Sequence, residues 1–361
     1  MAVFLRSAAR TPYGAFGGAF RRVAPEQLAA WAIREALGCA DMPPGQVDAL
    51  ILGQALRYGR GANPARRAAQ AAGLGTTCAA WGVDQGRASG LRALVAGLHA
   101  IEAGAHTRLV VAAADSASTV PYLIPAGRWG HRLGQSTAMD PLLLDAPERD
   151  AIRQQAMTQR QAELGICYDS LINWATHSRE KALSCPALCF PVTIAARKGP
   201  THLESDEILG MAPPSPEPGW PLPPLADAAA ALVMSAEGPG IRIAGFREAW
   251  ADRPTEALLG AVGPLLESAA LTPEDLDQVE VDESLLLSPL GLLQALPGLD
   301  PRRVNPGGGA FATGQAHSTE GLRLLISLFH GLERTGGRFG LAAMETADGL
   351  GLAILLERTP A

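Results

Sequence analysis

The fold is decided by a stretch that reads Gly82-Val83-Asp84-Gln85-Gly86-Arg87-Ala88-Ser89-Gly90-Leu91-Arg92-Ala93-Leu94. A strand-like approach leads into a turn of small residues, and an apolar helix follows to about Gly104. A helix that starts from such a turn presents free backbone N–H groups and the positive end of its dipole. That end suits an anion or a nucleophile of low pKa. The residue at this turn is Arg87, whose positive charge is unfavourable beside the positive end of the helix dipole.

Strand and helix patterns alternate on both sides of this stretch. Residues 47–53 and 108–114 are apolar and rich in branched side chains, which indicates strands, and helices are predicted over residues 24–37 and 63–72. Strands that alternate with helices predict an α/β fold with a largely parallel, buried sheet.

The composition changes between residues 116 and 225, where polar residues, aromatic residues and proline are more frequent. Helices are predicted near Pro147–Leu164 and Tyr168–Leu183. The region ends in the proline-rich tract Pro213–Pro224, which cannot form a helix or a central strand. We interpret this tract as a stiff surface connection of polyproline type.

The α/β pattern that returns after the tract repeats the first one. The run Gly90-Leu91-Arg92-Ala93-Leu94-Val95 resembles Gly321-Leu322-Arg323-Leu324-Leu325-Ile326, 231 residues later. A second pair of similar runs begins at Pro44 and Pro273, 229 residues apart, but a third begins at Asp227 and Asp348, only 121 apart. The shorter offset indicates an insertion of about 110 residues in the first copy. We therefore predict a first half over residues 1–115 and 226–245, an inserted domain over 116–225 and a second half over 246–361.

Composition excludes several classes of protein. The net charge of −6 and the absence of a basic run argue against nucleic acid and anionic membranes as partners. No apolar run approaches the roughly 20 residues that span a bilayer, and Met1 leads directly into a strand-like segment, so we expect no signal peptide. The five cysteines are scattered without a CxxC motif, which favours free thiols in a reducing cytoplasm and no metal site.

Four further motifs are Arg10-Thr11-Pro12-Tyr13-Gly14, Gly61-Ala62-Asn63-Pro64-Ala65-Arg66, Pro121-Tyr122-Leu123-Ile124-Pro125 and Val304-Asn305-Pro306-Gly307-Gly308-Gly309-Ala310. They resemble motifs of the thiolases, the family of acetyl-CoA acetyltransferases and 3-ketoacyl-CoA thiolases. The resemblance covers nearly the whole chain. It implies the thiolase fold, in which two similar βαβαβαββ halves with five-stranded sheets form an αβαβα sandwich and a loop domain is inserted in the first half. It also implies acyltransferase chemistry of lipid metabolism and a dimer.

Thiolase chemistry depends on residues that this chain replaces. In the family a Cys nucleophile lies at a helix N-terminus, a His acts as base, a second Cys moves a proton and an Asn holds a water. The family motifs, matched residue by residue, place Arg87 at the nucleophile, Gln315 at the base, Glu345 at the second Cys and Asp282 at the Asn. The loop-domain motif that contacts CoA in the family is replaced by Trp220-Pro221-Leu222-Pro223-Pro224.

These replacements carry a physical consequence. Neither a guanidinium nor an amide can act as a base near neutral pH, so the family mechanism is not expected to operate. A buried Arg at a helix N-terminus needs a compensating anion. We therefore predict that Arg87 forms a charge-assisted pair with Glu345 or Asp282. Ser89 and His317 lie beside the replaced positions and are retained as additional residues of a pocket.

Two hypotheses on function follow. In the first, the protein is a non-catalytic subunit or binding protein, a homodimer or a heteromer with an active thiolase-type paralogue, and requires no cofactor. In the second, it is an acyltransferase or hydrolase of altered mechanism that uses Arg87 and Glu345 on acyl-CoA or on a carrier-bound acyl group. The replaced loop motif argues against a CoA ester as ligand. Arg87 itself is either a plug or a binder of a carboxylate or phosphate.

Overall fold

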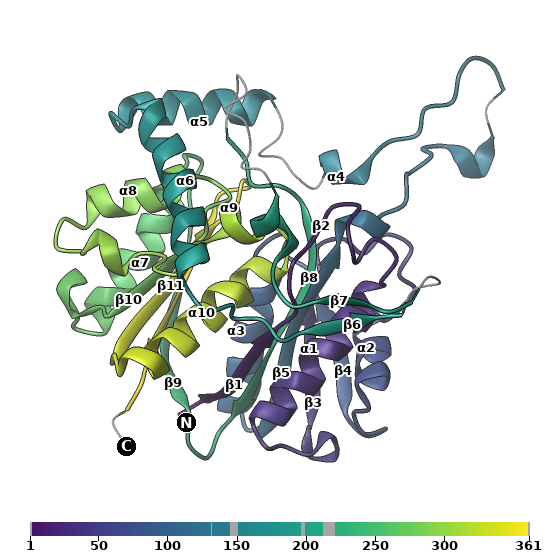
Figure 1. Ribbon diagram of the computed structural model, residues 1–361, viewed down its shortest axis with the longest axis horizontal. Coiled ribbons are helices and arrows are strands. Elements are labelled where there is room, and N and C mark those ends of the chain that lie inside the picture. Colours follow the sequence, from purple (N-terminus) through teal and green to yellow (C-terminus); the bar gives the residue numbers. More distant parts are fainter. Residues whose placement is uncertain (1, 131, 145–150, 196–198, 212–220, 360–361) are drawn as a thin grey trace.

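The computed structural model describes residues 2–130, 132–144, 151–195, 199–211 and 221–359, which form two α/β halves and an inserted segment (Figure 1). In the first half the strand order is β4 (Ala79–Val83), β3 (Ala49–Gly53), β5 (Arg108–Ser116), β8 (Ala226–Ser235) and β1 (Phe4–Arg10), and the short β2 (Gly14–Ala15) also pairs with β8. In the second half the order is β10 (Gln278–Val281), β11 (Phe339–Glu345), β12 (Leu350–Glu357) and β9 (Ile241–Trp250).

The two halves share one topology. We set β2 aside and number the strands of each half by their order in the chain. The strands of the first sheet then lie side by side in the order third, second, fourth, fifth, first. The second sheet has the same order, because Val304 forms a parallel bridge with Val279 of β10 at the place of the third strand. The internal repeat inferred from sequence is therefore confirmed.

A short contact joins the two sheets. Phe4 and Leu5 of β1 pair with Arg242 and Ile241 of β9, so hydrogen bonding continues from one half into the other. β9 pairs with β12 along nearly its whole length. Because β9 starts at Ile241, the second sheet begins before residue 246, where we had placed the start of the second half.

Helices form three layers around the two sheets. The helices α1 (Pro25–Cys39) and α2 (Pro64–Ala72) cover the outer face of the first sheet. On the second sheet the outer helices are α7 (Glu256–Ser268) and α8 (Leu287–Ala295), with leucines and valines between α7 and the strands. The middle layer consists of α3 (Ser89–Glu102) and α10 (Thr319–Thr335), whose apolar side chains pack against both sheets. This arrangement confirms the αβαβα sandwich. The prediction of a largely parallel sheet is wrong, because β1, β8, β9 and β12 run antiparallel to their neighbours.

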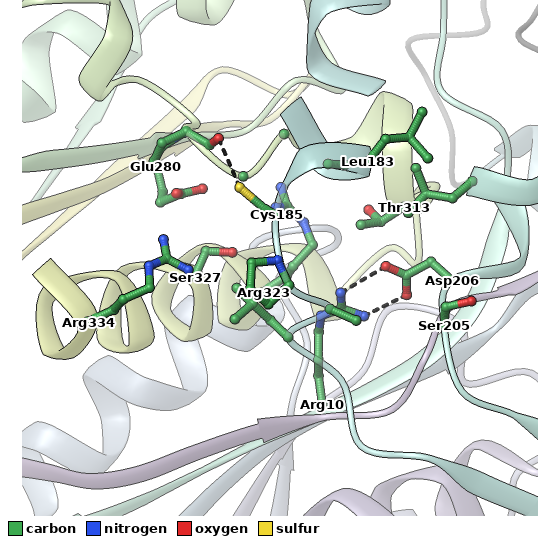
Figure 2. A pocket seen from close by; sticks show the side chains of 18 of the residues that line it. Arg10, Leu183, Cys185, Ser205, Asp206, Glu280, Thr313, Arg323, Ser327 and Arg334 are labelled. Carbon is green, nitrogen blue, oxygen red and sulfur yellow. Dashed lines mark hydrogen bonds and ion pairs between the residues drawn. The ribbon is translucent and has the colours of Figure 1, made fainter. Parts of the chain in front are cut away.

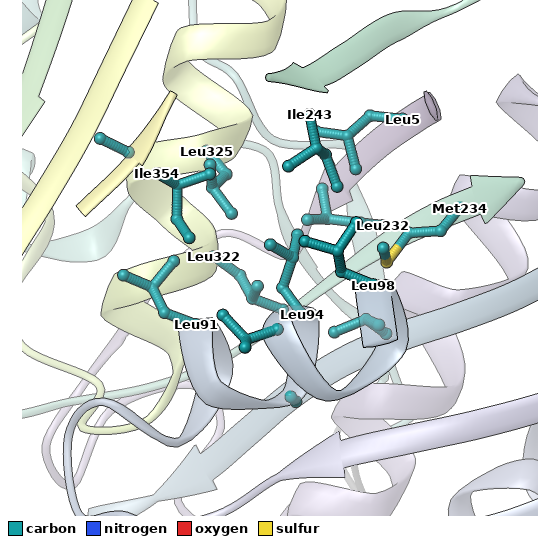
Figure 3. Close-up of a cluster of buried hydrophobic side chains, with 14 of the residues drawn as sticks. Leu5, Leu91, Leu94, Leu98, Leu232, Met234, Ile243, Leu322, Leu325 and Ile354 are labelled. Atoms are coloured by element: carbon teal, nitrogen blue, oxygen red, sulfur yellow. The ribbon is translucent and has the colours of Figure 1, made fainter. Parts of the chain in front are cut away.

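The two middle helices approach each other closely at their first turns. A Cβ on Gly90 of α3 would lie 2.4 Å from the carbonyl oxygen of Ser318, and one on Gly321 of α10 would lie 2.5 Å from Leu91 Cγ. Leu91 and Leu94 of α3 then meet Leu322 and Leu325 of α10 in the central cluster shown in Figure 3. The glycines thus position the N-terminal ends of both helices at the same place.

The inserted segment contains α4 (Pro141–Leu144), α5 (Ala151–Glu163), α6 (Tyr168–Ser184) and the hairpin of β6 (Val192–Ile194) and β7 (Thr201–Leu203). The start of the helix predicted from Pro147 and most of the proline-rich tract lie outside the described residues. A short helix, α9 (Ala310–Thr313), follows in the second half. No helix among the described residues is both long enough and apolar enough to cross a bilayer.

Two acidic side chains fasten the inserted segment to the N-terminal loop. Asp206 accepts hydrogen bonds from Arg10 Nη1 and Nη2 at 2.7 and 2.8 Å and from the N–H of Tyr13 at 2.8 Å. Glu207 accepts from the N–H of Ala15 at 2.8 Å. Bidentate Arg–carboxylate geometry fixes orientation as well as distance, so this contact sets how the segment lies on the sandwich.

Candidate functional site

The turn before α3 is ordered by Ser89. Its hydroxyl donates to the carbonyl of Gly86 at 2.6 Å and accepts from the N–H of Gln85 at 2.8 Å. Gly86 adopts a left-handed conformation, with φ of 52°, that closes the turn. Both hydrogen bonds of the Ser89 hydroxyl bind it to its own turn, so this buried residue supports the helix start.

Arg87 projects from this turn into the interior, where only 4% of its side chain is exposed. Its Nη2 donates to Oδ2 of Asp282, whose side chain is 2% exposed. The prediction of a charge-assisted pair is therefore confirmed, with Asp282 as the partner. A cation at the positive end of a helix is unfavourable, and the carboxylate compensates for it.

Asp282 and Glu345 reach this place from neighbouring strands. β10 and β11 are parallel, and Asp282 follows the carboxyl end of β10 while Glu345 is the last residue of β11. The two oxygens of Glu345 accept from the hydroxyl of Ser288 at 2.7 Å and from the N–H of Thr255 at 2.8 Å. These bonds tie Glu345 to the first turns of α8 and α7, and it is 3% exposed.

Gln315 and His317 lie in the tight connection between α9 and α10, and both are fully buried. The backbone of Gln315 is fixed by hydrogen bonds to Pro224 and Ala226, at 2.7 and 2.9 Å. His317 has a φ of 37°, a region that residues other than glycine rarely adopt. Strained backbone of this kind is found most often at functional sites, which agrees with the role that the resemblance gives to this loop.

The loop is held by Asp115 at the end of β5. Its carboxylate accepts from the N–H groups of Ala55, Leu56 and Ser318, at 3.1, 2.9 and 3.0 Å. Burial raises the pKa of Asp115 to about 6, although these hydrogen bonds act in the opposite direction. Asp115 thus connects the first sheet to the start of α10.

A further buried carboxylate, Glu283, was not predicted from the sequence as a site residue. It accepts from the indole N–H of Trp174 at 3.0 Å, from the hydroxyl of Ser178 at 2.7 Å and from the amide of Asn305 at 2.9 Å. Trp174 and Ser178 belong to α6, so Glu283 anchors the inserted segment beside the site. Its only signal in the sequence is its position next to Asp282.

The arrangement as a whole brings the sequence-predicted residues to one region. Arg87 and the loop of Gln315 and His317 come from the N-terminal ends of α3 and α10, which Gly90 brings into contact. Asp282 and Glu345 come from the carboxyl ends of parallel strands. The centre of this region is an ion pair between a guanidinium, which is a permanent cation, and a carboxylate.

Known proteins resemble this chain over its full length. Two family descriptions match it: "Thiolase, N-terminal domain" over residues 3–211 and "Thiolase, C-terminal domain" over residues 252–358. The acetyl-CoA acetyltransferase of Cupriavidus necator is 31% identical, with 99% of each chain covered. That of Rhizobium meliloti is 30% identical, with 99% of this chain and 98% of the relative covered.

Solved structures agree with these relatives. The acetyl-CoA acetyltransferase of Syntrophomonas wolfei superposes with a TM-score of 0.90 at 25% identity and 99% coverage of both chains. The acetyl-CoA acetyltransferase of Bacillus anthracis gives 0.88 at 26% identity, again with 99% of both chains covered.

Proposed function

Because the chain belongs to the thiolase family, we propose that it keeps the thiolase scaffold without Claisen or thiolysis chemistry and acts as a non-catalytic subunit or binding protein. The observation that carries this proposal is the buried ion pair of Arg87 with Asp282. Arg87 stands where the motif match places the nucleophile, and Asp282 where it places the residue that holds a water.

The charges explain why the pair acts as a plug. A guanidinium keeps its proton at every pH at which the protein is folded, so it can neither attack a thioester nor accept a proton. Loss of a nucleophile or base of this kind typically lowers the rate by several orders of magnitude.

The open edge of the first sheet supports association with another chain. β4 ends the strand order of the described sheet, and its residues are exposed or half-buried. Ala79 and Val83 hydrogen bond toward β3, so strand alternation turns the N–H of Gly82 toward the open edge. Such an edge is a template for pairing with another strand. We propose that β4 pairs with a second copy or with an active thiolase-type paralogue.

All five cysteines carry free thiols, which supports our assignment of the protein to the reducing cytoplasm.

The first experiment measures thiolysis of acetoacetyl-CoA and condensation of acetyl-CoA, the reactions implied by the names of the relatives. The purified wild-type protein should show no turnover above the background without enzyme. Turnover that disappears in both Arg87→Ala and Glu345→Gln would contradict the proposal and favour the altered-mechanism alternative. Calorimetry with CoA separates the two further, because a non-catalytic protein with the replaced loop motif should release no heat of binding.

The second experiment tests the partner. Gly82→Pro removes the outward N–H of β4 and leaves the pairing with β3 in place. Light scattering after size exclusion should show a dimer for the wild type and a monomer for this variant, or loss of a co-purifying thiolase if the partner is a paralogue. An unchanged assembly would rule out the β4 edge as the interface.

A further inference from the structure

A cavity that Arg87 does not line lies between the loop that follows α6 and the long helix α10 (Figure 2). Its volume is about 380 Å³, which lies within the size range of small-molecule sites. Arg323, Ser327 and Arg334 of α10 line it together with Glu280 of β10. The ion pair of Arg10 and Asp206 forms another part of its wall.

Arg323 brings a buried donor to this cavity. Its side chain is 2% exposed, and its Nε donates to Glu320 at 3.0 Å. Its Nη2 is buried and has no hydrogen-bond partner among the described residues. A guanidinium nitrogen can only donate, so the missing partner must be an acceptor.

Glu280 brings a buried acceptor. It is fully buried, and its Oε1 accepts from Gln278 Nε2 at 2.8 Å. Its Oε2 is buried without a hydrogen-bond partner in the described part of the chain. Burial raises the pKa of Glu280 to about 7, against the effect of the positive charge of Arg323. Arg323 and Glu280 therefore interact electrostatically, but no direct ion pair joins them among the described residues.

The rest of the wall differs from these two groups. Asp206 satisfies Arg10 with two hydrogen bonds, so this side of the cavity requires no further ligand. Arg334 is exposed and lines the same cavity from the last turn of α10. A positive charge there attracts an anionic ligand. Buried polar atoms of native proteins are nearly always paired with protein, water or ligand, and here the two residues that carry the unsatisfied atoms line a space larger than one water needs.

We propose that this cavity binds a small carboxylic acid that also carries a hydroxyl or amino group, with its carboxylate on Arg323 and its donor on Glu280. A multivalent anion such as phosphate fits less well because it would face the carboxylate of Glu280. The inference does not depend on the proposed loss of chemistry at Arg87, since the two sites share no residue.

The test is ligand-observed NMR and calorimetry with the full-length protein and four probes of one chain length: 4-hydroxybutyrate, 4-aminobutyrate, butyrate and 1-butanol. At least one of the two bifunctional acids should bind about tenfold or more tightly than butyrate and 1-butanol. No binding of any probe, equal binding of all four, or tighter binding of inorganic phosphate would overturn the proposal.

Variants then assign the binding to this cavity. Arg323→Lys and Glu280→Gln should each weaken the preferred acid about tenfold or more, while Arg302→Gln, a change at an exposed arginine, should leave the affinity unchanged. If either buried variant fails to fold by circular dichroism, Ser327→Leu, which fills the cavity from a partly exposed position, should abolish binding. Unchanged affinity in the folded variants would place the ligand elsewhere and overturn the assignment.

Discussion

The buried pair of Arg87 and Asp282 gives a prediction whose size can be worked out from its surroundings. Breaking a buried ion pair by removal of one partner costs about 3–5 kcal/mol, because the other charge stays buried. In Arg87→Met, Asp282 keeps the hydrogen bonds that Ser284 donates to its Oδ1, at 3.1 and 2.8 Å. We therefore expect a loss near the lower value, about 3 kcal/mol.

The reverse change should cost more. In Asp282→Asn the guanidinium loses its carboxylate but remains at the positive end of α3, so we expect about 5 kcal/mol. The double variant retains neither buried charge. Its loss should fall short of the sum of the single losses by at least about 2 kcal/mol, which is a coupling energy typical of directly interacting residues.

Urea unfolding followed by circular dichroism and tryptophan fluorescence measures these free energies. The protein concentration is kept fixed, since an oligomer changes its apparent stability by mass action. Arg302→Met at the exposed pair with Asp300 is the matched control, and it should leave the midpoint unchanged. Single losses that add within about 0.5 kcal/mol would refute the reasoning, because the two residues would then not be energetically coupled.

Three further predictions follow from other contacts. Gly90→Ala places a methyl group against a backbone carbonyl and should lower the free energy of unfolding in urea by about 1–3 kcal/mol. Gly38→Ala lies on the exposed face of α1, where nothing lies within 4 Å, and should raise it by about 0.5–1 kcal/mol. Equal effects of the two variants would contradict the close approach of α3 and α10. The pKa of Asp115 rises from 3.8 to about 6, so its contribution to stability is complete below pH 4 and is lost as the pH rises through 6, by about 3 kcal/mol in all; Asp115→Asn should flatten the unfolding midpoint over this range, and an unaltered slope would assign it to other groups. Glu283→Gln weakens the bonds to α6 and should lower stability by about 1–3 kcal/mol and speed limited proteolysis within the inserted segment; an unchanged cleavage rate would mean that Glu283 does not anchor it.

Much of the architecture could be predicted because strands, helices and the repeat are visible as patterns in short runs of residues. Strand and helix periodicities reflect which side chains face the core, and they are visible in runs of a few residues. The repeat of Gly90–Val95 at Gly321–Ile326 identified the two halves, and the shorter offset near Asp227 identified the insertion. We predicted that the second half starts at residue 246, whereas the turn Gly238-Pro239-Gly240 leads directly into β9 of the second sheet at Ile241.

The contacts of the site were harder to predict. Simultaneous replacement of several motif positions indicated that Arg87 had a carboxylate partner, but Asp282 and Glu345 were equally good candidates. The structure shows an ion pair of Arg87 with Asp282, while the oxygens of Glu345 accept hydrogen bonds from the first turns of α7 and α8. Asp206 left no local signal and Glu283 only its position next to Asp282, since most of their partners lie far away along the chain.

The sequence by itself therefore determined the alternation of strands and helices, the repeat and the position of a cation at the start of α3, because each is visible in short runs of residues, whereas the layers were implied by the resemblance to the thiolases. Only the tertiary structure decided that Arg87 pairs with Asp282, and that Arg323 and Glu280, each with an unsatisfied buried atom, line one cavity. The physical reason is that a buried charge is compensated by whichever group the packing of distant segments brings within reach. Burial and pairing are properties of that packing, and no spacing along the chain encodes them.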